Sequence, residues 1–361
     1  MEKIGIKKFI EYSKTFPVLD VRSPGEFIHA HIPNAYNLPL FSDEERKIVG
    51  TAYKQESREK SIKLGLDFFG VKMRKMVEVA EEIIIKHDIG NTTNKSILVH
   101  CWRGGMRSAA VAWLLNLYGF KVYTLAGGYK SFRNWVLEQF ENKYVLNVIG
   151  GYTGSGKTFI LHELEKKKET IIDLEGIAKH KGSAFGGFEQ IQPSQEMFEN
   201  ELAVKLQENN NNLHPDKSIW VEDESQRIGA INIPASFWKT MRKSPVYFID
   251  IPFENRLQHI VAEYGNIKRE ELINAIMRIQ KRLGNLETKN AINFLLEKDT
   301  ISSFSILLRY YDKQYEKGLH NRENINELLQ KISCINVDAK INTKLLLNSI
   351  LYKQEENNGR L

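Results

Sequence analysis

Cysteine is scarce in this sequence, and that scarcity limits what the chain can be. Two cysteines among 361 residues exclude a framework of disulfide bonds and a metal cluster held by several thiolates. Apolar runs are short as well, so no segment has the length of a membrane span, and the N-terminal residues lack the pattern of a secretion signal. We therefore expect a cytoplasmic protein without membrane contact, and its length favours two domains.

Charge of one sign is in only modest excess. The net charge is +6 and the isoelectric point is about 9.0. A surplus of this size is compatible with a polyanionic partner such as nucleic acid, but many basic proteins bind none. Charge alone therefore does not identify a partner.

Short apolar segments alternate with helical patterns in the first third of the chain. Strands are predicted at residues 16–23, 35–39, 96–100 and 121–128. The stretch 43–87 is polar with helical periodicity. Strands separated by helices predict a parallel sheet with covering helices, in a first domain over residues 1–138.

A second α/β pattern follows a short linker and predicts another domain over residues 143–361. Its first helix is predicted at 157–167, and its strands at 144–151, 170–174, 218–223 and 245–251. After Pro252 the pattern is mostly helical, with one late strand predicted at 334–338. The asparagine-rich residues 208–213 are predicted to form a surface loop.

The first candidate site is the segment HCWRGGMRS at residues 100–108. A cysteine that follows a buried strand and precedes glycines and a helix lies where backbone N–H groups converge, which binds anions and lowers a thiol pKa. Arg103 and Arg107 add positive charge, and Gly104 and Gly105 let the backbone approach a bound group. The alternative is a packed cysteine with solvent-facing arginines. For Cys334, which lacks such neighbours, a core or half-buried thiol is the prediction. The complete predicted anion loop comprises Cys101, Trp102, Arg103, Gly104, Gly105, Met106, Arg107 and Ser108.

The second candidate site is GGYTGSGKT, residues 150–158, which contains the G-x-x-x-x-G-K-[ST] pattern of a P-loop between a predicted strand and helix. Its residues Gly151, Gly154, Ser155, Gly156, Lys157 and Thr158 are predicted to hold a diphosphate group. Thr158, with Asp223 or Glu222 from the strand end WVEDES, would ligate a magnesium ion if the loop uses one. The pattern predicts a pyrophosphate-bearing ligand without specifying ATP.

The N-terminal residues resemble the rhodanese family. LDVRSPGEFIHAHIPNAYNLP matches the opening signature of that family, and LAGGY follows the helix after Cys101 as the family's next strand does. The resemblance implies scaffold roles for Asp20, Arg22 and Glu26. Five residues separate Cys101 from Arg107, where sulfur-transferring rhodaneses usually have four. The longer loop is similar to that of phosphatase relatives, which bind a tetrahedral oxyanion.

Together, HCWRGGMRS, YKQESREKSIKLG, GYTGSGKT, LEGIAKHKGSAFG and VEDESQRIG resemble the bacterial tRNA 2-selenouridine synthase family. The resemblance implies a rhodanese-like domain fused to a P-loop NTPase-like domain with a mostly helical C-terminal part. It implies an enzyme that acts on 2-thiouridine at the wobble position (U34) of tRNAs for Lys, Glu and Gln. The sulfur is first alkylated by geranyl diphosphate, and the S-geranyl group is then replaced by selenium from selenophosphate, which another enzyme supplies. No tightly bound cofactor is expected, and the chain is expected to act as a monomer.

The two co-substrates suit the two predicted loops. Geranyl diphosphate suits the P-loop, and selenophosphate suits the Cys101 loop, where Cys101 is expected to take selenium as a perselenide while Arg103 and Arg107 hold the phosphate. His180, Arg227 and the phenylalanines of SAFGGF match the family and are secondary candidates for the nucleotide or prenyl pocket.

Contacts with tRNA are less well defined by the sequence. Residues 179–183 and the mixed basic and aromatic residues of the helical tail could contact phosphates and stack on bases. The tail residues are Arg309, Tyr310, Tyr311, Lys313 and Tyr315. An ordinary amphipathic helix explains them equally well.

Three other functions remain open on the sequence. The first is a rhodanese-related phosphatase with a regulatory P-loop, which would hydrolyse aryl phosphates through Cys101. The second is a P-loop NTPase or kinase with a degenerate rhodanese domain, which would depend on Lys157 and be indifferent to Cys101. The third is a non-catalytic RNA-binding module, in which neither residue would matter.

Overall fold

The computed structural model describes residues 1–87, 95–181, 191–212, 218–265 and 267–358. The chain divides into two compact units: an N-terminal unit of residues 1–139 with 199–204, and a C-terminal unit of residues 140–198 with 205–361. Both contain a parallel sheet with helices, so the predicted α/β class is confirmed. Among the described helices, none has the length and apolar character needed to cross a membrane.

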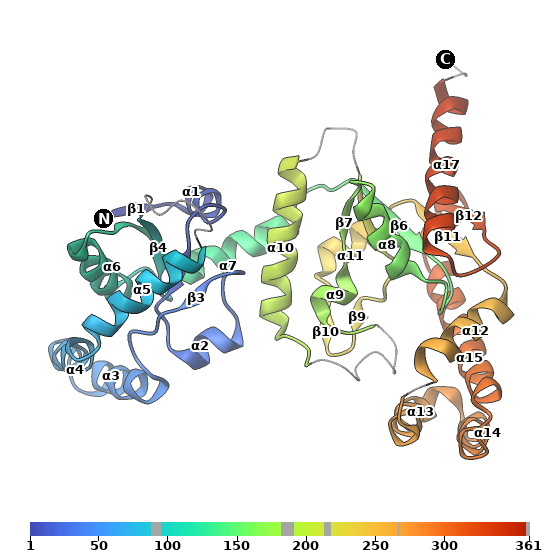
Figure 1. Ribbon diagram of the computed structural model, residues 1–361, viewed down its shortest axis with the longest axis horizontal. Coiled ribbons are helices and arrows are strands. Elements are labelled where there is room, and N and C mark those ends of the chain that lie inside the picture. The colour runs from blue at the N-terminus through green and yellow to red at the C-terminus, as the bar shows by residue number, and fades with distance from the viewer. Residues whose placement is uncertain (88–94, 182–190, 213–217, 266, 359–361) are drawn as a thin grey trace. The chain divides into compact units, whose positions relative to one another are not determined.

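The N-terminal unit is built on a five-stranded parallel sheet with the order β1-β5-β4-β2-β3. Its strands are β1 (Glu2–Ile4), β2 (Val18–Asp20), β3 (Tyr36–Asn37), β4 (Ser96–His100) and β5 (Lys121–Leu125) (Figure 1). Every residue of β2 and β4 is buried, in agreement with the apolar residues Val18, Leu19 and 97–99 that they contain. The loop that follows β4 therefore starts from the middle of the sheet.

Among the described residues, seven helices lie wholly within this unit. They are α1 (Ile6–Tyr12), α2 (Pro24–His29), α3 (Asp43–Gln55), α4 (Arg58–Gly70), α5 (Met73–His87), α6 (Met106–Tyr118) and α7 (Gly128–Gln139). Ser23 with Glu26, and Ser42 with Glu45, form capping boxes that fix the starts of α2 and α3. Helix α6 ends at Gly119 in the left-handed conformation, as a glycine C-cap does.

The C-terminal unit has its own five-stranded parallel sheet, ordered β12-β11-β6-β8-β7. The strands are β6 (Leu146–Gly150), β7 (Thr170–Ile172), β8 (Ile219–Glu222), β11 (Val246–Asp250) and β12 (Leu329–Ser333), and β9 (Arg227–Ile228) pairs with β10 (Ile231–Asn232) in a separate hairpin. Strand β6 is central, so the P-loop that follows it lies at the carboxyl edge of the sheet.

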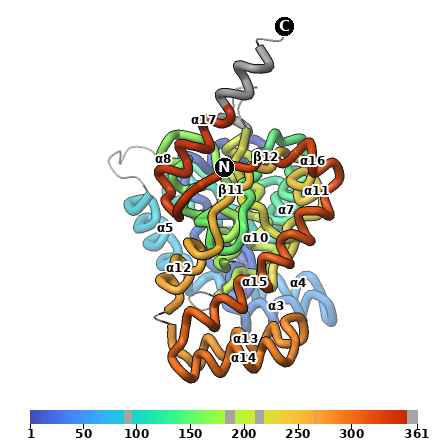
Figure 2. The backbone as a smooth tube through the Cα atoms, turned by 90° about the vertical axis from the view of Figure 1, so that its right-hand side faces the viewer, coloured from blue at the N-terminus to red at the C-terminus, as the bar shows by residue number. Residues whose placement is uncertain are grey.

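Helices α8 (Lys157–Lys166), α9 (Leu174–Ala178), α10 (Gln195–Asn212), α11 (Ala235–Arg242) and α17 (Ala339–Asn358) are distributed along this part of the chain. The others follow β11: α12 (Phe253–Tyr264), α13 (Arg269–Leu283), α14 (Asn285–Leu296), α15 (Thr300–His320) and the short α16 (Ile325–Leu328). Helices α12 to α15 share a second apolar core that includes Leu257, Ile276, Leu295 and Leu308. Figure 2 shows α13, α14 and α15 grouped together, as the predicted helical C-terminal part requires.

Two local predictions are wrong. The sequence predicts the late strand at residues 334–338, but the structure has it as β12 at Leu329–Ser333, an edge strand with intermediate or exposed residues at most positions. The asparagine-rich stretch continues α10 to Asn212 instead of forming a loop. Phe198, Leu202 and Leu206 are spaced by four residues and buried, and this apolar stripe extends a helix that asparagine alone would not favour.

Candidate functional site

The Cys101 loop connects β4 to α6 in the N-terminal unit. Gly104 has φ +63°, and a Cβ there would lie 2.5 Å from the Leu125 carbonyl oxygen. Gly128 has φ +60°, and its Cβ would lie 2.3 Å from the Cys101 carbonyl oxygen. Tyr129 N–H donates to that same carbonyl at 2.8 Å. The glycine turn after β5 thus packs directly against the loop and sets its shape.

The Cys101 side chain lies inside the loop and is buried. Its thiol donates to Ser108 Oγ at 3.2 Å, and the Ser108 hydroxyl donates to the Gly105 carbonyl at 3.1 Å. Burial raises the pKa of the Cys101 thiol, but hydrogen bonds from Ser108 and the Gly105 N–H, together with the charge of Arg107, outweigh it and hold the pKa below the ordinary value. The surroundings of Cys101 therefore favour a thiolate.

The two predicted arginines of the loop lie in different surroundings. Arg103 is exposed. Arg107 pairs with Glu26 of α2, with 2.8 Å between Nη1 and Oε2, and Arg46 Nε contacts the same oxygen at 3.0 Å. One carboxylate is therefore shared by two guanidinium groups.

Asp20 and Arg22 form a buried ion pair at the end of β2. The Arg22 guanidinium lies 3.8 Å from the centre of the buried Tyr129 ring and 5.7 Å from the Trp102 ring. Tyr129 and Trp102 are 5.6 Å apart between ring centroids. The scaffold role expected for Asp20 and Arg22 is thus a platform beneath Trp102.

A pocket of about 460 Å³ opens beside the loop. It is lined by Arg22, Gly25, Glu26, His29, Asp43, Arg46, Trp102 and Arg107. Five of these residues come from α2 and α3, which no local sequence pattern connects with the Cys101 loop. Met106, another predicted loop residue, is largely exposed at the start of α6.

The P-loop has the geometry predicted for a phosphate-binding turn. Gly151, Gly154 and Gly156 all have positive φ, at 148°, 80° and 73°. Lys157 Nζ donates back to the Gly151 carbonyl at 3.2 Å, across the loop that begins helix α8. Ser155 is buried, and its hydroxyl has no hydrogen-bond partner among the described residues. The motif thus brings N–H groups and a lysine together at a helix N-terminus.

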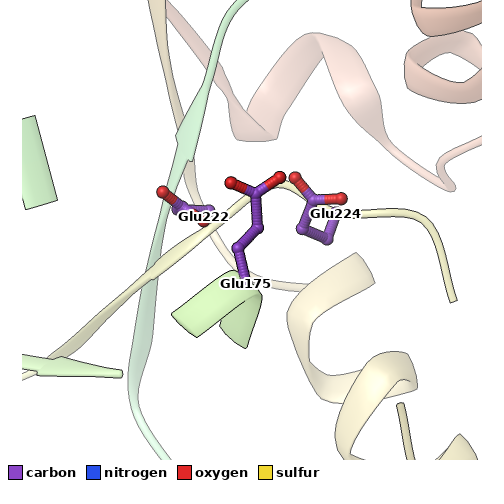
Figure 3. A group of neighbouring side chains, drawn as sticks. All are labelled: Glu175, Glu222 and Glu224. Atoms are coloured by element: carbon purple, nitrogen blue, oxygen red, sulfur yellow. The ribbon is translucent and has the colours of Figure 1, made fainter. Parts of the chain in front are cut away.

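Three carboxylates gather next to the P-loop (Figure 3). One oxygen from each of Glu175, Glu222 and Glu224 lies within 4.8 Å of the others, and the Thr158 hydroxyl donates to Glu175 at 3.3 Å. Glu222 is fully buried, and neither of its oxygens has a hydrogen-bond partner among the described residues. Burial, followed by the charges of Glu175 and Asp173, raises the pKa of Glu222 to about 8.

The oxygens of Asp223 are engaged elsewhere. Arg322 pairs with one of them, and the Tyr315 hydroxyl donates to the other at 2.7 Å. The same Tyr315 hydroxyl accepts a hydrogen bond from the Gly151 N–H at 3.1 Å. Of the two strand-end carboxylates proposed near a metal, Glu222 thus joins the cluster beside Thr158, while Asp223 links the P-loop to helix α15. Tyr315 is consequently part of the P-loop support.

The secondary candidates are more scattered. Arg227 Nε donates to the Gly229 carbonyl at 2.9 Å, and a Cβ on Gly229 would lie 2.8 Å from the His180 ring, so both residues surround the β9–β10 turn. The phenylalanines of SAFGGF lie outside the described residues. In α15, Arg309 covers the Phe253 ring, Tyr310 packs edge-on against Tyr311, and Lys313 is exposed.

Sequence reasoning missed Glu175 and Glu224 as members of the carboxylate cluster. Both lie inside segments that carry the family resemblance, LEGIAKHKGSAFG and VEDESQRIG. Glu175 is in α9 and Glu224 is two residues beyond the end of β8, so their meeting depends on the adjacent strands β7 and β8. The general rule that strand ends meet at one sheet edge could have suggested it.

Comparison with known proteins adds two family matches. A family model described as the tRNA 2-selenouridine synthase AAA domain matches residues 144–332, and a rhodanese-like domain model matches residues 6–134. These ranges contain the P-loop with its carboxylates and the Cys101 loop, respectively.

Full-length relatives carry the name tRNA 2-selenouridine synthase. The protein from Bdellovibrio bacteriovorus is 38% identical over 354 residues, which cover 86% of this chain and 91% of the relative. The protein from Shewanella piezotolerans is 33% identical to this chain, and the match covers 88% of the length of that relative. The protein from Nitrosomonas europaea is 38% identical over 255 residues, and the chain spans 63% of the length of this relative.

Proposed function

Because the chain belongs to the tRNA 2-selenouridine synthase family, we propose that it is an enzyme that converts 2-thiouridine in tRNA into 2-selenouridine. The proposed substrate position is the wobble uridine of tRNAs for Lys, Glu and Gln, and the route passes through S-geranyl-2-thiouridine. The observation that carries the proposal is the presence of two oxyanion loops in one chain, one with a thiolate and one with a P-loop lysine. The two co-substrates, geranyl diphosphate and selenophosphate, each offer one oxyanion group.

The first step is assigned to the P-loop. The 2-thio sulfur attacks C1 of geranyl diphosphate, the C1–O bond breaks, and diphosphate leaves with the electron pair while the nucleobase loses its N3 proton. The loop N–H groups and Lys157 stabilise the negative charge that develops on the departing diphosphate. This is charge stabilisation of a leaving group, which P-loops provide without specifying the nucleophile.

The carboxylates beside Thr158 fit a divalent cation. Hard cations such as Mg²⁺ take oxygen ligands, and the orphaned oxygens of buried Glu222 lack any other partner among the described residues. Glu175, Glu222 and Thr158 would hold the ion, with Glu224 at the edge of the set. When bound, it would supply additional positive charge next to the diphosphate.

The second step is assigned to the Cys101 loop, where electron balance limits the chemistry. A perselenide on Cys101 would contain selenium two electrons more oxidised than that of selenophosphate, and neither co-substrate accepts those electrons. Transfer of the phosphoryl group needs no oxidant. The Cys101 thiolate attacks phosphorus, an S–P bond forms, the P–Se bond breaks, and hydroselenide leaves with the electron pair.

The liberated hydroselenide then attacks C2 of S-geranyl-2-thiouridine, the C2–S bond breaks, geranylthiolate leaves with the electron pair, and the hydroselenide proton passes to N3 to give 2-selenouridine. Water cleaves the S–P bond, which releases phosphate and restores the thiolate. Hydroselenide is a weak base, so its departure needs no proton donor, and the described contacts of the Cys101 thiol include no carboxyl group. A loop with five residues between cysteine and arginine is consistent with a tetrahedral phosphoryl group.

The decisive experiment is mass analysis of wobble nucleosides from thiolated tRNA after incubation with the protein and both co-substrates, each also omitted in turn. Geranyl diphosphate alone should give S-geranyl-2-thiouridine, and addition of selenophosphate should give 2-selenouridine. Cys101→Ser should stop only the second reaction and Lys157→Ala only the first, with Cys334→Ser and Lys166→Ala as matched controls. Unchanged 2-thiouridine under every condition would refute the proposal and direct attention to phosphatase and ATPase assays.

A further inference from the structure

The pocket beside the Cys101 loop has no role in the steps proposed above. The loop itself supplies the N–H groups and the thiolate that a small oxyanion needs. Its neighbouring pocket measures about 460 Å³, within the range of roughly 300–1,000 Å³ of pockets that hold drug-sized ligands. A selenophosphate ion is much smaller than this space, so the pocket calls for a larger occupant.

One wall of the pocket is an aromatic ring held in a fixed position. Trp102 keeps 38% of its surface exposed while its ring lies against the buried Tyr129 and the buried Arg22. Arg22 is itself fixed by its ion pair with Asp20 and by donation to the Ala30 carbonyl at 2.8 Å. A ring that is already immobile loses little conformational entropy when a planar group stacks on it.

Arginine side chains also line the same pocket. Arg46 and Arg107 both contact Oε2 of Glu26, and the Arg46 side chain is half exposed. Asp43 also lines the pocket, where its carboxylate accepts from the Gly25 N–H, so the group that can meet an anion is the half-exposed guanidinium of Arg46. Arginine forks match the geometry of phosphate oxygens.

An aromatic wall with a cationic edge matches a nucleotide better than the other reactants of the proposed function. A geranyl chain would gain nothing from the arginines, and a free oxyanion would gain nothing from the indole. Proteins that recognise single-stranded RNA stack unpaired bases on aromatic side chains and contact the adjacent phosphates. We infer that this pocket receives the extruded wobble nucleotide, with the base on Trp102 and a flanking phosphate at Arg46.

The placement is also chemically sensible, because Trp102 follows Cys101 directly in the chain. A base stacked on Trp102 would lie beside the loop in which hydroselenide is released. The inference rests on the proposed function for its choice of nucleotide. Trp102 is accordingly a substrate-binding residue, while Arg22 and Tyr129 are positioning residues.

The test is a binding measurement that does not depend on turnover. Anisotropy of a labelled anticodon stem–loop with 2-thiouridine at the wobble position is compared with that of the same RNA carrying an abasic wobble site. Trp102→Ala should weaken binding of the first RNA roughly 5- to 140-fold, the equivalent of about 1–3 kcal/mol per stacked base, and of the abasic RNA less than twofold. Trp102→Phe should restore most of the loss, and Trp113→Ala, an exposed tryptophan on α6, should have no effect.

Two outcomes overturn the inference: an equal loss for both RNAs, or no loss beyond twofold for either. A Trp102→Ala protein that misfolds would weaken both RNAs equally, and Trp102→Phe with an intact fold then decides whether the aromatic face matters. A separate measurement, the mass of Cys101 after incubation with selenophosphate, tests the proposed function. Wild-type Cys101 that gains no phosphoryl mass from selenophosphate would refute the selenation step but leave the binding comparison valid.

Discussion

The buried carboxyl of Glu222 leads to a quantitative prediction about stability. Its folded-state pKa is about 8, above the ordinary value of 4.5, because burial and the neighbouring carboxylates disfavour the charged form. The folded protein therefore holds a proton that the unfolded chain releases above pH 4.5. The full stability is present below pH 4.5 and falls as the pH rises toward 8.

The size of the effect follows from the pKa difference. At pH 8 the cost of folding with Glu222 is about 4 kcal/mol, since each unit of pKa shift corresponds to about 1.36 kcal/mol. Glu222→Gln keeps the shape of the side chain and cannot ionise, so it removes this cost. For a domain of 150–250 residues, roughly 2–4 °C per kcal/mol makes the expected gain in melting temperature on the order of 10 °C at pH 8.

Scanning calorimetry of wild type and Glu222→Gln at pH 5 and pH 8, in the presence of a chelator, measures the difference. The variant should melt well above wild type at pH 8 and close to it at pH 5, while Glu297→Gln, an exposed glutamate in the same unit, should match wild type at both. A variant that gains nothing at pH 8 would mean that Glu222 is not held as an uncharged acid, and the reasoning from its burial would be wrong.

Three further predictions concern the two loops. Cys101 and Cys334 are almost equally inaccessible, at 3% and 4% exposure, but the pKa of the Cys334 thiol is raised to about 11 while that of Cys101 is lowered. Iodoacetamide at pH 7 should therefore label Cys101 first, which peptide mapping would reveal. Equal labelling of the two cysteines would contradict a thiolate at Cys101. Gly128→Ala should lower the free energy of unfolding by about 2–5 kcal/mol, because alanine is strained in the left-handed conformation and its Cβ would contact the Cys101 carbonyl, and it should abolish selenation. Gly50→Ala, with open space around its Cβ, should leave the melting temperature unchanged. A chelator should suppress geranylation of thiolated tRNA but not selenation of RNA that is already geranylated, and equal suppression in nucleoside mass analysis would place the cation elsewhere.

The positions of the Cys101 loop and of the P-loop were predictable from sequence because both patterns are local. Each consists of consecutive residues after a buried apolar strand, and glycines at fixed spacing identify the turn. The Glu175–Glu222 contact could not be predicted in this way, since 47 residues separate the two in the chain. Their meeting depends on β7 and β8 being neighbours in the sheet, and strand order is not encoded in any local pattern. The pocket next to Cys101 has the same origin, because α2 and α3 reach Trp102 only through the tertiary fold.

The misplaced late strand has a different physical cause. Strand β12 is at the sheet edge, paired only with β11, so its residues need not be uniformly apolar. The segment Leu329–Ser333 contains Gln330 and Lys331, which made the more apolar residues 334–338 look like the strand. Central strands such as β4, buried along their whole length, leave no such ambiguity.

The two loops differ in how their surrounding charge is balanced, and this difference bears on their chemistry. Around Cys101 two carboxylates form ion pairs: Arg22 pairs with Asp20, and Arg46 and Arg107 share Glu26. Beside the P-loop, Lys157 faces three carboxylates that lie within 4.8 Å of one another. Positive charge is therefore built into the Cys101 loop, whereas the P-loop must acquire it from protons or a cation. A nucleophilic thiolate needs a constant positive field, whereas a departing diphosphate needs positive charge only while its own charge develops.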